Sequence, residues 1–77
     1  MTTDLTAEVQ RHAKAAKKII AAWEKHGPPQ GTVDDNLKMI SDELELLERL
    51  AIAHPRRAKG LRRLAERYGE FRAQLVA

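Results

Sequence analysis

The side chains with the greatest capacity for chemistry in this sequence are three histidines, His12, His26 and His54, and a single serine, with no cysteine. Two histidines share a metal ion only if the fold brings them to one point. If the first two predicted helices are antiparallel, His54 lies about six residues, or roughly 9 Å of helix rise, beyond the level of His12. No His-x3-His or Glu-x-x-His pair occurs on a predicted helix. The sequence therefore predicts neither a metal site nor a cofactor.

Catalytic groups are equally sparse. Ser41 has no histidine at short spacing, and Asp42, Glu45 and Glu48 fall on the solvated side of a predicted helix. Carboxylates in such positions form ion pairs more often than they transfer protons. The glycines between the first two helices bracket a Pro-Pro turn and do not form a phosphate-binding loop. These features predict that the protein is not an enzyme.

Basic residues form two exposed faces that could bind phosphate. Arginine-rich helices suit phosphate contacts, although the aromatic residues all fall in core stripes and would not be free to stack on bases. A solvated, partly ion-paired surface is the favoured interpretation, and a nucleic-acid site is the alternative. The possible nucleic-acid-binding residues are Arg11, Lys14, Lys18 and Lys25 in the first helix and Arg56, Lys59, Arg62, Arg63 and Arg67 in the third.

The elements that position these side chains are three amphipathic helices, at about residues 3–26, 32–54 and 55–76. Each carries apolar residues at spacings of three and four, which place them on one face of a helix. Gly27 and Pro28 end the first helix, Thr32 begins the second as N-cap, and Pro55 ends it. The register of an antiparallel arrangement predicts a cluster at the end of the bundle that holds the first connector, formed by Trp23, Leu37, Phe71 and Leu75.

Charge is unevenly distributed along the 77 residues. The first 27 residues carry a net charge of +2, residues 32–54 carry −4, and residues 55–77 carry +5, which together give the net +3 of the chain. An acidic helix between two basic ones favours ion pairs within a bundle. The same distribution leaves the outer faces of the basic helices positive, and it predicts contact between Glu48 and Arg63.

The central helix carries a second apolar row beside its core stripe, which consists of Val33, Leu37, Ile40, Leu44, Leu47 and Ala51. A helix that buries one neighbour needs one stripe, so the second row favours a further contact. If the third helix covers the row only in part, the remainder is available to a partner or to a second copy of the chain. The predicted partner-binding residues are Met39, Leu46, Leu50 and Ile52.

Residues 1–77 are therefore expected to form one all-α domain, an up-down-up three-helix bundle. The alternative is a helical hairpin whose long second helix is kinked at Pro55 and which dimerises to cover its apolar face. No segment has the length of a membrane span or the layout of a signal peptide, which predicts a cytoplasmic location. The leading functional hypothesis is a small, non-enzymatic regulatory or adaptor protein that binds another protein or itself, with a homodimer slightly favoured.

Overall fold

The computed structural model describes residues 4–77, and side chains from Ala7 onward. Its elements are α1 (Asp4–His26), α2 (Val33–Ala53), a short 3-10 turn η1 (Pro55–Arg57) and α3 (Ala58–Val76). The described residues contain no strand, so the prediction of an all-α chain is confirmed. Thr3, the expected start of the first helix, lies outside the described residues.

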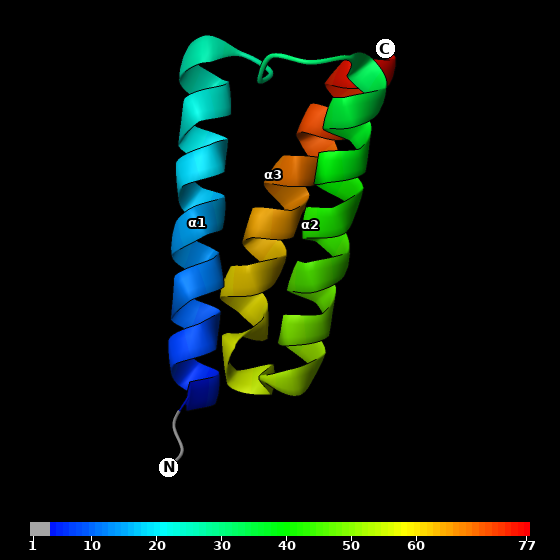
Figure 1. Ribbon diagram of the computed structural model, residues 1–77. Coiled ribbons are helices and arrows are strands. Elements are labelled where there is room, and N and C mark those ends of the chain that lie inside the picture. Colours follow the sequence, from blue (N-terminus) through cyan, green and yellow to red (C-terminus); the bar gives the residue numbers. More distant parts are fainter. Residues whose placement is uncertain (1–3) are drawn as a thin grey trace.

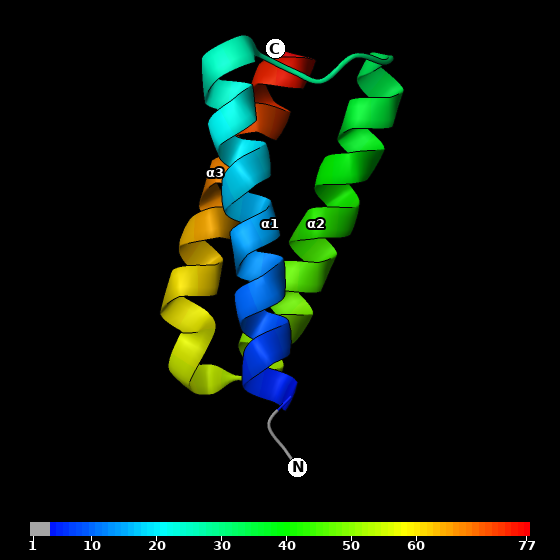
Figure 2. The ribbon, with the colours of Figure 1, turned by 60° about the vertical axis from the view of Figure 1, so that its left-hand side comes forward.

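The helices lie side by side in an elongated body of 43 × 18 × 17 Å. In Figure 1, α1 rises from the N-terminal end, a connector crosses the top, α2 descends, and α3 returns beside α2. The 3-10 turn η1 separates α2 from α3. Turned by 60°, the molecule shows α1 lying across the front of the α2–α3 pair (Figure 2).

Local chemistry fixes where the first two helices end and begin. Gly27 has a φ of +84°, a conformation that favours glycine, and its N–H donates to the Trp23 carbonyl over 2.7 Å. Thr32 forms a reciprocal capping box with Asp35: the Asp35 N–H donates to the Thr32 hydroxyl at 3.0 Å, and the Thr32 N–H donates to the Asp35 carboxylate at 3.2 Å. The predicted N-cap is confirmed.

The core is a continuous apolar cluster contributed by all three helices. At its upper end the rings of Trp23 and Phe71 stack with centroids 4.7 Å apart and planes 3° apart, and Tyr68 meets the Phe71 ring edge-on at 6.4 Å. Of the predicted cluster, Trp23 and Phe71 meet and Leu75 packs against the core, whereas Leu37 is half-buried and does not belong to it. The buried apolar residues are Val9, Ala16, Ile20, Trp23, Ile40, Leu47, Leu50, Ala51, Leu61, Tyr68 and Phe71.

The core face of α2 is centred differently from the expected stripe. Val33 is exposed and Leu37 only half-buried, whereas Asn36 and Leu50 are buried. The core side of α2 includes two polar side chains, and each has a hydrogen-bond partner. The Asn36 amide donates to the Pro29 carbonyl at 3.2 Å, and Glu43 accepts a hydrogen bond from Tyr68. Asn36 thereby ties the first connector to α2.

The hydrogen bond between Asn36 and Pro29 should contribute measurably to the free energy of unfolding. Asn36→Ala should lower the free energy of unfolding by about 1–2 kcal/mol, because it removes the hydrogen bond and leaves the Pro29 carbonyl without its partner. Urea unfolding followed by circular dichroism measures the change. Gln74→Ala is the matched control, since Gln74 is an exposed amide on α3, and its midpoint should not move. Equal midpoints for the two variants would contradict a structural role for Asn36.

Candidate binding groove between α1 and α3

The residues considered for chemistry lie apart from one another. His26 is exposed, while His12 of α1 and His54, the residue that follows α2, are half-buried. Among the described residues, no group of three or more histidine, cysteine or carboxylate side chains could hold a metal ion.

The acidic pairs of α2 take part in ion pairs on the surface. Asp42 pairs with Lys38 at 3.6 Å, Glu45 with Arg49 at 3.0 Å, and Glu48 with Arg62 of α3 at 3.8 Å. The partner of Glu48 is thus Arg62 and not the expected Arg63, which lies one residue, or about 100°, further around α3.

The four predicted partner-binding residues of α2 do not form one surface. Leu50 is 6% exposed and belongs to the core, while Met39 and Leu46 are half-buried against it. Ile52 is 67% exposed, because residues two apart on a helix lie about 200° apart. The apolar strip left open on α2 is therefore much smaller than the sequence predicted.

The basic residues divide into paired and unpaired sets. Arg67 bonds both Glu70 and, across to α1, Glu24, and its guanidinium lies 5.3 Å from the centre of the Phe71 ring. Arg62 is held by Glu48, so two of the five cations predicted for the third helix are engaged within the molecule. The others that were predicted, Arg11, Lys14, Lys18, Lys25, Arg56, Lys59 and Arg63, are exposed.

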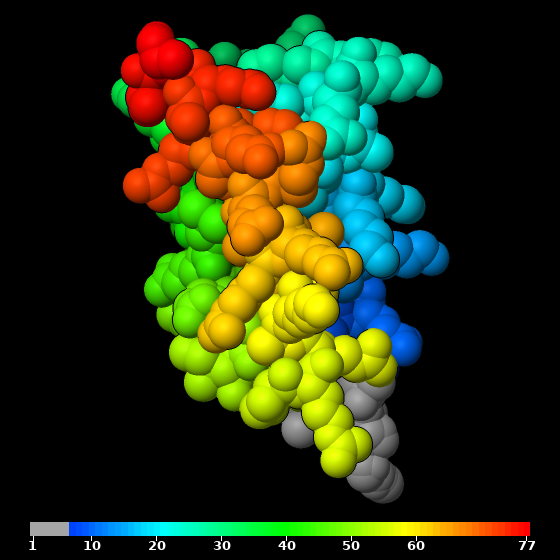
Figure 3. Space-filling view, turned by 180° about the vertical axis from the view of Figure 1, so that it is seen from behind, coloured from blue at the N-terminus to red at the C-terminus, as the bar shows by residue number. Residues whose placement is uncertain are grey.

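A groove of about 420 Å³ lies in the seam between α1 and the start of α3. In the space-filling view this seam runs between the blue of α1 and the yellow to orange of α3 (Figure 3). Apolar side chains dominate its wall. The lining residues are Val9, Gln10, Ala13, Lys14 and Lys17 from α1, Arg57 from η1, and Gly60, Leu61 and Leu64 from α3.

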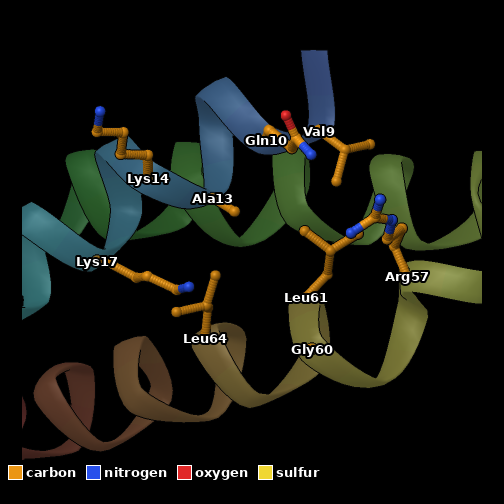
Figure 4. Close-up of a pocket in the computed structure, with 9 residues that line it drawn as sticks. All are labelled: Val9, Gln10, Ala13, Lys14, Lys17, Arg57, Gly60, Leu61 and Leu64. Atoms are coloured by element: carbon orange, nitrogen blue, oxygen red, sulfur yellow. The ribbon is translucent and has the colours of Figure 1, made fainter. Parts of the chain in front are cut away.

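Three cations border this apolar wall. Figure 4 shows Lys17 reaching from α1 toward Leu64, Arg57 reaching toward α1 beside Leu61, and the Lys14 ammonium turned outward. None of the three takes part in a salt bridge among the described side chains, and none of the described lining residues is acidic. The groove thus combines apolar surface with three cations that form no salt bridge to a described side chain.

Residue size accounts for the opening of the seam at this end. Toward the top, Trp23 and Phe71 fill the space between the helices, and the Arg67–Glu24 pair closes the surface. Lower down, the lining contains Ala13 from α1 and Gly60 from α3. A Cβ atom added to Gly60 would meet no atom within 4 Å, so there is open space at this position.

The sequence pattern did not indicate Lys17, Arg57 or Gly60 as site residues. The available signal was the placement of small residues, Ala13 and Gly60, on helix faces that flank the core. It becomes informative only when the register between α1 and α3 is known.

Tyr68 and Glu43 form the most buried polar contact of the core. The Tyr68 hydroxyl donates to the Glu43 carboxylate at 3.1 Å, and the tyrosine is 0% exposed. Burial raises the pKa of Tyr68 above its ordinary value, and the negative charge and hydrogen bond of Glu43 raise it further. The phenol is therefore neutral at physiological pH and acts as a fixed hydrogen-bond donor.

Comparison with protein-family models, with curated proteins and with solved structures finds no match to this chain. Among the described residues, the helices are not long and apolar enough to cross a bilayer. The interpretation of the site therefore rests on its own geometry and charge.

Proposed function

We propose that this chain is a non-enzymatic adaptor, an up-down-up three-helix module that binds another protein through the groove between α1 and α3. The observation that carries the proposal is the pairing of an apolar wall with cations that have no partner in the described structure. Exposed apolar surface bordered by polar groups is typical of a protein-interaction site. Two roughly parallel helix walls present a trough in which a third helix can lie.

Self-association through α2 is the weaker form of the proposal. Leu50 lies in the core, and Ile52 points away from the half-buried Met39 and Leu46. The exposed face of α2 is mainly acidic, and two copies of it would repel one another.

Nucleic-acid binding is the competing candidate, because Arg11, Lys18 and Lys25 extend the positive surface of α1 beyond the groove. All three aromatic side chains of the chain, Trp23, Tyr68 and Phe71, are buried and so cannot stack on bases. Binding to nucleic acid would then rest on phosphate contacts alone and would fall steeply with salt.

Filling the groove tests the proposal. We expect the immobilised protein to capture a partner from extracts of its source cells, and Gly60→Leu to reduce that capture at least about tenfold, because the leucine side chain projects into the space the partner needs. Gly69→Leu is the matched control. Gly69 is also a helical glycine of α3 at which an added Cβ atom would meet nothing within 4 Å, but it does not line the groove.

Two results would contradict the proposal. One is that Gly60→Leu captures the same protein, in the same amount, as the unaltered chain does. The other is captured material that disappears after nuclease treatment, which would favour the nucleic-acid alternative. Circular dichroism of each variant establishes that the helices are intact.

A further inference from the structure

The positions of the groove cations restrict what the groove can bind. Val9 and Lys17 lie on α1 eight residues apart, which corresponds to about 12 Å along the helix axis. Arg57 lies at the Val9 end of the groove, and Lys17 lies at the Leu64 end (Figure 4). The two cations thus lie toward opposite ends of the apolar wall formed by Val9, Ala13, Leu61 and Leu64.

We infer that the groove binds an acidic amphipathic helix that has one large apolar side chain between two carboxylates placed about two turns apart. This inference rests on the proposed function and adds the chemistry of the partner. The apolar side chain enters the space beside Gly60, and the carboxylates meet Arg57 at one end and Lys17 at the other. Two turns of helix span about 11 Å, close to the distance between the ends of the groove.

Charge complementarity decides between this occupant and others. The groove is lined by cations and has no acidic lining residue among the described side chains. A basic segment would therefore be repelled, and a neutral segment would leave the cations unpaired. A second copy of the chain fits less well. The large exposed apolar residues of its acidic helix, α2, are Val33 and Ile52 at opposite ends of that helix, and Glu45 and Glu48 near Ile52 already hold arginines.

The open shape of the groove favours a helix over a small molecule. The wall is provided by residues 9–17 of α1 and 60–64 of α3, with the cation Arg57 near one end and Lys17 near the other. Recognition of this kind uses an apolar anchor for affinity and flanking charges for selection.

Two synthetic peptides test the inference. Both have the same helix-forming sequence with a central leucine, and they differ only in carrying Glu or Gln at the two flanking positions about two turns apart. We expect the Glu peptide to bind the full chain about tenfold more tightly than the Gln peptide by fluorescence anisotropy at low salt, since two partly shielded ion pairs are worth roughly 1–2 kcal/mol together. Raising the salt concentration should reduce this difference.

Neutralising the cations should remove the preference. The double variant Lys17→Gln/Arg57→Gln should bind both peptides alike, with the affinity that the unaltered chain has for the Gln peptide. Arg11→Gln/Lys25→Gln is the matched control, because it removes the same charge from exposed positions outside the groove lining, and it should keep most of the preference for the Glu peptide. Gly60→Leu should weaken the binding of both peptides at least about tenfold, and Gly69→Leu should change the binding of neither.

The outcomes separate the inference from the proposed function. The two peptides could bind equally well, with both interactions lost in Gly60→Leu. That result would overturn the selection for acidic helices, but the groove would remain a protein-binding site. Binding of neither peptide, or binding that Gly60→Leu does not change, would overturn the inference itself. In that case the capture experiment with the same glycine variants still decides the proposed function.

Discussion

Replacing Phe71 with alanine should lower the free energy of unfolding by about 3–5 kcal/mol. Phe71 is 2% exposed, stacks on Trp23 of α1 and meets the edge of Tyr68, so its truncation leaves a cavity where the helices meet. A domain of this size has a total stability of only about 4–12 kcal/mol. The loss is therefore a large fraction of the total, and the urea midpoint of the variant should fall far below that of the unaltered chain.

The measurement can use the protein's own reporter. The chain has one tryptophan, and it lies in this stack, so fluorescence of Trp23 during urea unfolding follows the contact directly. Ile52→Ala is the matched control because Ile52 is apolar but 67% exposed, and its stability should stay within about 0.5 kcal/mol of the unaltered chain. The stability of Phe71→Leu should lie between those of Phe71→Ala and Ile52→Ala, since leucine retains apolar volume but loses the ring stack. A Phe71→Ala variant as stable as Ile52→Ala would show that the stack does not hold α1 to α3.

The sequence was sufficient for the local features of this fold. Gly27 and Thr32 mark helix ends through interactions within a few residues of themselves, so their roles could be predicted without knowing the tertiary structure. The meeting of Trp23 with Phe71 followed from assuming that the helices run antiparallel with short connections. Such predictions succeed because they depend on helix periodicity and on chain length.

Features that depend on a distant partner could not be predicted. The predicted core stripe of α2 contains no polar residue, yet Asn36 and Glu43 lie on its core side because Pro29 and Tyr68 supply their hydrogen bonds. This shifted the expected core face of α2 and left Leu50 in the predicted partner surface. Hydropathy alone cannot show that a polar side chain has a partner.

The candidate groove was missed for a related reason. Lys14 was among the predicted site residues, but as part of a phosphate-binding strip on α1 alone. The groove exists because small residues of two helices, Ala13 and Gly60, line the same space, and because Arg57 follows a turn that brings it beside α1. Each of these depends on how α1 sits against α3, which no pattern within a single helix specifies.

Folding stability should decline above about pH 10, and Tyr68 should account for much of the decline. The folded protein keeps this phenol neutral, because burial and then the Glu43 carboxylate raise its pKa above the ordinary value of about 10 that it has in the unfolded chain. A group with a raised pKa in the folded state stabilises the fold fully below its unfolded pKa, and this contribution is lost as pH rises through the folded pKa. The expected slope is about 1.4 kcal/mol per pH unit, or about 2–3 kcal/mol between pH 10 and 12.

Tyr68→Phe isolates this effect from the ionisation of lysines, which is common to both proteins. At neutral pH the variant should be less stable by about 1 kcal/mol, because the Glu43 hydrogen bond is lost. Above pH 10 its stability should fall less steeply, so the difference between the two proteins narrows and then reverses. Since Tyr68 is the single tyrosine of the chain, the ultraviolet absorbance of tyrosinate also follows it alone. That absorbance should stay low while the helices persist and rise together with the loss of helical circular dichroism. An absorbance change near pH 10 with the helices intact would mean that the phenol is accessible to water and that its contact with Glu43 does not hold it neutral.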